Sequence, residues 1–171
     1  MTNQSSETDQ ATKTAAVGLL DYLRRHECVA EIVSPGVPMS TVPLAAAAIS
    51  VEPEQILKSL LFVDGSGTAV LAIASGTGKI NRARLAAAAN TGFLKLADAE
   101  TVRAVTGFPV GGVAPVGHAT QIQVVIDQAV MALSNAYGGG GADDVLLRIA
   151  PADILRMTNG VVAGIADPAG H

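Results

Sequence analysis

The segment LKSLLFVDGSGTAVLAIAS, residues 57–75, constrains the fold of this chain more than any other stretch. Two apolar runs of strand length flank Gly65-Ser66-Gly67, and a short glycine-rich connection between two such runs is typical of a β-hairpin. We therefore expect two antiparallel strands here, and we expect this hairpin to form the centre of the sheet.

Helix and strand patterns follow one another irregularly along the rest of the chain. Helical patterns or helix caps appear at residues 15–27, 40–50 (Ser40 or Thr41 as N-cap), 81–90, 98–107 (capped by Asp98, ended by Gly107), 128–137 and 151–158, with a brief turn or helix at Pro53. Strand patterns appear at residues 29–35, 121–128, 144–150 and 160–166. Because no regular β–α–β alternation is present, the sequence predicts the α+β class. We expect a single compact domain with a mixed, largely antiparallel sheet and surrounding helices.

Length and composition bound the organisation of the chain. The 171 residues fit one domain, expected over residues 14–166, with a disordered polar tail over 1–13 and a C-terminal tail over 167–171. No apolar run reaches the roughly 20 residues of a membrane span, and the first residues are too polar for a signal peptide. We therefore expect a cytoplasmic protein with no membrane partner.

Cys28 is the only cysteine, which excludes an intrachain disulfide and indicates a small core or surface residue rather than a nucleophile.

Charge is distributed unevenly along the sequence. Taken alone, the net charge of −4 argues against a nucleic-acid partner, and no DNA partner is expected. Residues 58–103, however, hold six Lys or Arg against three Asp or Glu, and Lys79, Arg82 and Arg84 fall within six residues. Such a patch can contact a few phosphates but not a long duplex. The alternative interpretation is the solvated entrance of a helix.

The common catalytic side-chain arrangements are absent from the sequence. Gly65-Ser66-Gly67 lacks the frame of a hydrolase nucleophile turn, and the glycine run at 138–141 is not followed by the Lys-Ser/Thr of a phosphate-binding loop. His26, His118 and His171 are too far apart for metal-ligand spacing. We expect neither a metal nor a cofactor.

Three features remain for which a function can be argued. Residues 106–118, TGFPVGGVAPVGH, can hold a row of backbone N–H groups that binds a carbonyl oxygen or an oxyanion; the alternative is an ordinary loop. Lys58 interrupts an apolar run, either as an edge-strand lysine that reaches solvent or as an ammonium at the mouth of a pocket. His118 ends the loop, either as a cap that faces solvent or as a participant in catalysis.

Four motifs in this order, ILKSLLF, TGFPVGGVAPVG, QIQVVID and YGGGGADD, resemble the YbaK/EbsC family, also described as the prolyl-tRNA synthetase-associated or insertion-domain-like editing fold. The resemblance covers roughly residues 14–166. It implies a free-standing aminoacyl-tRNA deacylase, which hydrolyses the ester between a wrong amino acid and the terminal ribose of tRNA.

The resemblance also implies roles for individual residues. Lys58 corresponds to the lysine that holds the tRNA end or substrate, and Ser59 corresponds to the neighbouring hydroxyl residue. The family's G-x-x-x-P loop directs backbone amides at the aminoacyl carbonyl, and here it comprises Gly111, Gly112, Val113, Ala114 and Pro115. Further substrate contacts are implied at Tyr137, Gly138, Gly139 and Asp144. Tyr137 departs from the small hydroxyl residue of some relatives.

The expected function is trans-editing of tRNA that carries a small amino acid such as Ala, Cys or Ser, with tRNA-Pro as one acceptor. The expected partner is mischarged tRNA, bound at its CCA end and aminoacyl group, with Lys79, Arg82 and Arg84 near phosphates; a synthetase is a second candidate partner. An activated ester needs water placement and oxyanion stabilisation more than a nucleophile. Two alternatives stay open: a non-catalytic module that binds a tRNA end or a synthetase in the same pocket, and a hydrolase of small unrelated esters.

Overall fold

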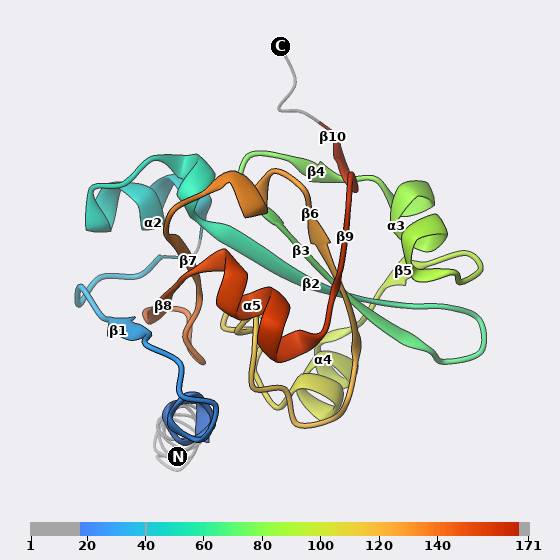
Figure 1. Ribbon diagram of the computed structural model, residues 1–171, viewed down its shortest axis with the longest axis horizontal. Helices are drawn as coiled ribbons and strands as arrows, with labels where there is room; N and C mark the ends of the chain where they lie inside the picture. Colours follow the sequence, from blue (N-terminus) through green and yellow to red (C-terminus); the bar gives the residue numbers. More distant parts are fainter. Residues whose placement is uncertain (1–17, 40, 168–171) are drawn as a thin grey trace, which may run out of the picture.

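In the computed structural model, which describes residues 18–39 and 41–167, the predicted hairpin lies at the centre of a five-stranded sheet (Figure 1). Strands β2 (Leu57–Val63) and β3 (Ala69–Ser75) pair antiparallel along their whole length. The Asp64 carboxylate accepts hydrogen bonds from the amides of Ser66 and Thr68, both at 2.9 Å, and so stabilises the turn. The hairpin prediction is confirmed.

The predicted terminal tails and one predicted cap fall largely outside the structure. The tail expected over residues 1–13 lies outside the described residues, as do Ser40 and residues 168–171, which include His171. The described chain begins in a helix, residues 18–25.

The strands form three sheets. The five-stranded sheet has the order β5-β2-β3-β6-β9, with β5 (Lys95–Leu96) antiparallel to β2, and with β6 (Gln123–Asp127) and β9 (Val161–Ala163) parallel to β3. A second, antiparallel sheet has the order β1-β8-β7, formed by β1 (Glu31–Val33), β8 (Leu146–Ile149) and β7 (Ala136–Gly139). A two-stranded pair joins β4 (Lys79–Ile80) to β10 (Ala166–Asp167). The α+β class is confirmed, and five of the seven strand pairings among the described residues are antiparallel.

Helices cover both faces of the large sheet. Leu71 and Ile73 of β3 face one side, where α4 (Ala99–Thr106), α5 (Pro151–Thr158) and the first helix pack. Val70 and Ala72 face the other side, against α3 (Arg82–Ala89). All four β3 side chains are fully buried, so this strand is the middle of the core. Within the described residues, no helix has both the length and the apolar character needed to cross a bilayer.

Helix α2 (Val42–Ile49) lies beside the second sheet. Thr41 caps it, because the Thr41 hydroxyl accepts a hydrogen bond from the Leu44 amide at 3.3 Å. Its alanines Ala45 and Ala46 pack with buried residues that include Ile56 and Leu146. A short 3-10 turn, η1 (Pro53–Gln55), then leads directly into β2. The start of β2 lies next to β7 of the second sheet, because Ile56 forms a β-bridge with Tyr137.

The helix predicted over residues 128–137 is wrong. Only a single 3-10 turn, η2 (Val130–Ala132), forms there, and the chain enters strand β7 at Ala136. The glycines of β7 gave no strand pattern in the sequence. They allow β7 to pack closely against another segment of the chain, since an added Cβ at Gly138 would lie 2.8 Å from Pro115 Cδ. The two-residue strands β4, β5 and β10 were also not predicted, since two residues carry no periodicity.

Candidate active site

A cavity of about 390 Å³ lies where α2, the start of β2 and residues 110–113 meet. Five of the predicted site residues line it, namely Lys58, Ser59, Gly111, Val113 and Gly139. The apolar residues Val42, Ala45, Val110 and Leu146 supply other parts of its wall. Segments far apart in the sequence therefore meet around one space.

The cavity follows the edge of β2. Neighbouring residues in a strand point to opposite faces of the sheet. Residues 57–60 nevertheless all line the cavity, so the cavity runs along the edge of the strand rather than over one face. This is the edge away from β3, because β3 pairs with β2 throughout and β5 pairs only with Phe62 and Val63.

Main-chain groups of Ser59 point toward this open edge. On the β5 side of β2, the Leu61 carbonyl accepts a hydrogen bond from the Ala97 amide at 2.9 Å. Backbone groups two residues apart in a strand point the same way. The N–H and C=O of Ser59 therefore face the cavity side, where they can pair with an extended polar ligand.

Lys58 is partly buried beside the cavity. Its ammonium group donates a hydrogen bond to the Gly78 carbonyl oxygen at 2.7 Å. Burial lowers the pKa of Lys58 below its usual value. Within the described residues no carboxylate lies within ion-pair distance of the ammonium, whose remaining two N–H donors stay available for an anionic or carbonyl ligand.

The side chain of Ser59 carries an orphan hydroxyl. Its Oγ is inaccessible to solvent and has no hydrogen-bond partner among the residues that the structure describes. Buried hydroxyl groups are normally satisfied, because leaving one unpaired costs about 1–3 kcal/mol. Because solvent does not reach this Oγ, a ligand in the cavity that Ser59 lines can bond to it only after the side chain rotates toward the cavity.

The loop over residues 109–115 begins with a tight turn. The Gly112 amide donates to the Pro109 carbonyl at 2.9 Å, and Gly111 adopts a φ of +87°. A positive φ at the third position is the requirement of a type II turn, which glycine meets without strain. Gly111 is thereby placed in the cavity wall with its backbone exposed to the ligand space.

The glycine run of β7 holds this loop by backbone contact. The Gly141 amide donates to the Gly112 carbonyl at 2.9 Å. An added Cβ at Gly112 would lie 2.7 Å from the Ala142 nitrogen, and one at Gly139 would overlap the Val113 carbonyl. Because there is no room for side chains between the two segments, the loop is held rigidly.

Two amides in the cavity wall are left without protein acceptors. No residue in the described part of the chain accepts a hydrogen bond from the N–H of Gly111 or of Val113. Rigidly held, unpaired N–H groups are the donors that stabilise a carbonyl oxygen as it gains negative charge. The loop therefore has the chemical means to bind an acyl oxygen.

The remaining predicted substrate residues lie elsewhere. Asp144 is exposed in the turn between β7 and β8 and does not line the cavity. Tyr137 lies on β7, outside the cavity wall. It forms a β-bridge with Ile56 and packs against the buried residues around α2. Ala114, Pro115 and Gly138 lie behind the wall and support it.

The three predicted phosphate contacts lie on β4 and α3. Lys79 is exposed and directly follows Gly78, the partner of the Lys58 ammonium. Arg84 forms an ion pair with Asp167 at 3.4 Å, and the Arg82 guanidinium lies 5.8 Å from the centre of the Phe62 ring. Lys79 is thus the basic residue joined most directly to the cavity.

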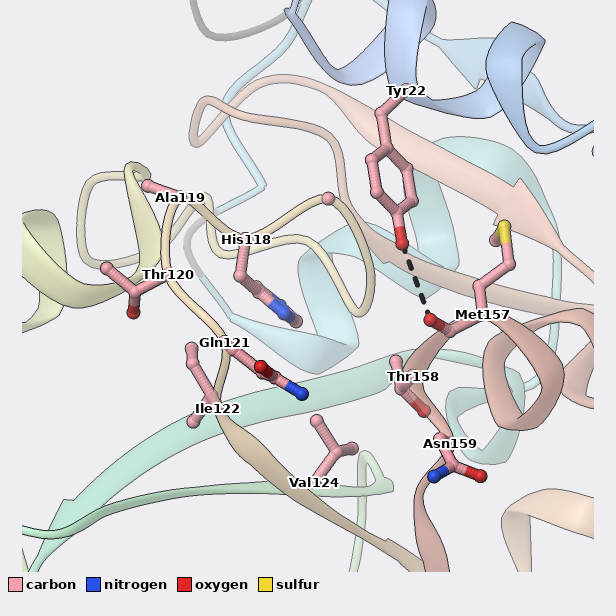
Figure 2. A pocket seen from close by; sticks show the side chains of 11 residues that line it. Tyr22, His118, Ala119, Thr120, Gln121, Ile122, Val124, Met157, Thr158 and Asn159 are labelled. Atoms are coloured by element: carbon pink, nitrogen blue, oxygen red, sulfur yellow. Dashed lines mark hydrogen bonds between the residues drawn. The ribbon is translucent and has the colours of Figure 1, made fainter.

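His118 lies on the other side of the loop. Its Nε2 lies 2.8 Å from the Ala114 carbonyl oxygen, and its ring meets the edge of Phe108 at 6.3 Å between centroids. Two further cavities, of about 370 and 310 Å³, border His118 together with Tyr22. Figure 2 shows the larger one, with Gln121, Thr158 and Asn159 around it.

Some residues of the site were not predicted from the sequence. Thr41, Val42 and Ala45 bring α2 into the cavity wall, and the Gly78 carbonyl holds Lys58. The position of a backbone carbonyl cannot be predicted from residue types. The helix pattern of α2 does not indicate which strand the helix packs against. Val110 carried one signal in the sequence, its place directly before Gly111; in the structure its side chain is 61% exposed.

The chain is similar to known proteins over most of its length. The sequence model of a family described as "Aminoacyl-tRNA editing domain" matches residues 37–157. A proline–tRNA ligase of Desulforamulus reducens is 34% identical over 143 residues, which are 84% of this chain and 24% of the ligase. A proline–tRNA ligase of Lysinibacillus sphaericus is 30% identical over 126 residues, 73% of this chain and 22% of the ligase. The chain therefore spans about a quarter of the length of these relatives.

Solved structures show the same architecture. The crystal structure of a candidate trans-editing enzyme for prolyl-tRNA synthetase superposes with a TM-score of 0.81 at 30% identity, covering 90% of this chain and 97% of that one. The crystal structure of the hypothetical protein APE2540 gives a TM-score of 0.81 at 29% identity, covering 88% of this chain and 99% of that one.

Proposed function

Because the chain belongs to the aminoacyl-tRNA editing domain family, we propose that it hydrolyses the ester bond of mischarged aminoacyl-tRNA in trans. The observation that carries this proposal is the meeting of Lys58, Ser59 and the unpaired amides of Gly111 and Val113 around one cavity. Hydrolysis of an activated ester needs an oxyanion-binding group and an ordered water, and the loop amides supply the first of these.

The proposed reaction is a direct attack of water. The acyl carbonyl oxygen accepts hydrogen bonds from the Gly111 and Val113 amides, and water adds to the acyl carbon to give a tetrahedral oxyanion. Collapse of this oxyanion breaks the ester bond, and the departing ribose oxygen takes up a proton. A preorganised donor of this kind typically lowers the barrier by about 3–4 kcal/mol.

The proton on the attacking water needs an acceptor. The cavity wall contains no Asp, Glu or His, and Lys58 is its only ionisable side chain within the described residues. We therefore assign proton transfer to a hydroxyl of the substrate ribose, and the ordering of the water to the Ser59 hydroxyl after its side chain rotates into the cavity. Asp144, an implied substrate contact whose carboxylate is a second candidate for ordering the water, is exposed outside the cavity.

The small apolar wall suits a small aminoacyl group. Val42, Ala45, Val110 and Leu146 bound the space, so Ala-, Cys- and Ser-tRNA are the first substrates to test, with tRNA-Pro as the first acceptor. The Lys58 ammonium contacts the CCA end. Lys79, which follows the Gly78 partner of Lys58, contacts a neighbouring phosphate.

Deacylation of a panel of mischarged tRNAs tests the proposal. At least one panel member is expected to be hydrolysed with multiple turnovers, and Lys58→Ala is expected to lower kcat/KM roughly 10- to 100-fold, the value of a hydrogen bond to a charged group. The matched control is Lys95→Ala, an exposed lysine on β5, which should leave kcat/KM unchanged. Equal rates for wild type and Lys58→Ala would contradict the proposal.

A non-catalytic binding module is the second candidate. The absence of an acid or base other than Lys58 from the described cavity wall favours it. Saturable binding of an aminoacyl-adenosine analogue without turnover of any panel member would support the module, whereas multiple turnovers would exclude it.

A further inference from the structure

His118 is directed back onto the loop that precedes it. Gly117 has a φ of +78°, which reverses the chain between Val116 and His118. The imidazole Nε2 then lies 2.8 Å from the carbonyl oxygen of Ala114, four residues earlier. Since a carbonyl oxygen can only accept, Nε2 is the donor and carries the proton.

The surroundings of the ring favour its neutral form. Burial lowers the pKa of His118, more than the bond to Ala114 raises it. The ionisable residues that share its cavities are Tyr22 and Arg25; no Asp or Glu of the described chain lines them. The ring is therefore a neutral donor at physiological pH, and its Nδ1 has no partner among the described residues.

No other side chain in the described part of the protein forms a hydrogen bond with residues 111–115. The Gly112 end of the loop is held by two backbone bonds, from Gly112 to Pro109 and from Gly141 to Gly112. At the Ala114 end the bond from His118 is the only hydrogen bond among the described residues, since Pro115 has no N–H and is held by packing against Gly138. The orientation of the Ala114 peptide group therefore depends on the imidazole.

We propose that His118 is a positioning residue, whose Nε2–H holds the Ala114 carbonyl and thereby keeps the Gly111 and Val113 amides directed at the cavity. Its effect on catalysis rests on the proposed function; its effect on the loop does not. The imidazole takes no part in proton transfer, because it lies behind the loop and does not line the catalytic cavity.

Three substitutions separate this role from others. His118→Gln keeps an N–H donor at a similar distance from the backbone. His118→Asn keeps an amide but is too short to place its nitrogen where Nε2 lies. His118→Phe keeps a ring of similar size beside Phe108, so that the buried site stays filled while the donor is lost.

Amide hydrogen exchange of residues 109–118 in the free protein is the first measurement. Exchange of the Gly112 amide, the one amide of residues 111–115 with an acceptor among the described residues, should rise about tenfold in His118→Phe and in His118→Asn as the loop loosens, and should return to near the wild-type rate in His118→Gln. Unchanged exchange in His118→Phe would overturn the proposal whether or not the protein is a deacylase.

Deacylation kinetics provide the second measurement. His118→Phe should lower kcat roughly 10- to 100-fold, the usual cost of a displaced reacting geometry, with KM changed less than about twofold. His118→Gln should recover most of kcat with the wild-type pH profile. If His118→Gln is as slow as His118→Phe and the acid limb of the profile disappears in both, His118 is an acid–base group and the positioning role is wrong.

Discussion

The Lys58 ammonium donates a hydrogen bond to the Gly78 carbonyl oxygen at 2.7 Å, which ties the start of β2 to the turn between β3 and β4. The bond sets the position of the ammonium at the edge of the cavity before any ligand arrives. It also joins the cavity to Lys79, the next residue along the chain.

Ligand binding should weaken at alkaline pH. Burial lowers the pKa of Lys58 from its usual 10.5, so the ammonium loses its proton, and with it the attraction for an anionic ligand, as the pH rises through that lowered pKa. We expect the Kd of a non-hydrolysable aminoacyl-adenosine phosphate analogue to rise between pH 8 and 10.5. Lys58→Arg, which stays protonated, should remove this pH dependence; a wild-type Kd that stays flat over the range would contradict the assignment.

Replacing Gly139 by Ala should destabilise the fold and displace the loop. The new Cβ would overlap the Val113 carbonyl, and overpacking of this kind typically costs about 1–3 kcal/mol. Urea unfolding measures the free energy of unfolding of this variant. Gly65→Ala is the matched control, because a Cβ at Gly65 meets nothing within 4 Å, and it should change stability by less than about 0.5 kcal/mol.

Replacing Ser59 by Ala should separate stability from function. Removal of a buried, unpaired hydroxyl should leave the free energy of unfolding unchanged or raise it by up to about 1 kcal/mol, while deacylation slows. Thermal unfolding and kcat/KM measured on the same preparation test this. Asp144→Asn, on the exposed turn outside the cavity, should keep kcat/KM within about twofold. The opposite pattern would assign the water-ordering role to Asp144.

The folded state should lose stability as the pH falls below about 6.5. Burial lowers the pKa of His118 from 6.5, so below that value the unfolded chain binds a proton that the folded protein resists. The contribution of His118 is therefore fully retained above pH 6.5 and declines as the pH falls toward its lowered pKa. Denaturation midpoints between pH 5 and 7 should fall less steeply in His118→Phe than in wild type; parallel profiles would argue against this titration.

Elements whose structure depends on interactions between residues close in the sequence could be predicted. The hairpin over 57–75 could be predicted because two apolar runs and a glycine turn act within a few residues. Caps such as Asp98, which accepts from the Thr101 amide at 2.8 Å, are equally local. The pairing of β3 with β6 depends on distant residues, and no local pattern indicates it.

The candidate site was predicted only in part, for the same reason. Lys58 and the 111–115 loop were chosen from their residue types and from a family resemblance, and the structure brings both to one cavity. The contributions of α2 and of the Gly78 carbonyl to the site arise from tertiary packing. Strand β7 was missed because glycine has a low strand propensity, and only the loop packed against it explains its presence.

The backbone contact between the glycine run and the loop limits how this protein can be redesigned. In the wall formed by Gly111, Val113 and Gly139, an added Cβ at Gly139 would overlap the Val113 carbonyl, and Gly111 has a φ of +87°, so substitution of either glycine strains the backbone before it can alter selectivity. The opposite wall is made of the side chains of Val42 and Ala45 on α2. Libraries intended to change the accepted amino acid should therefore randomise α2 and leave the glycines untouched.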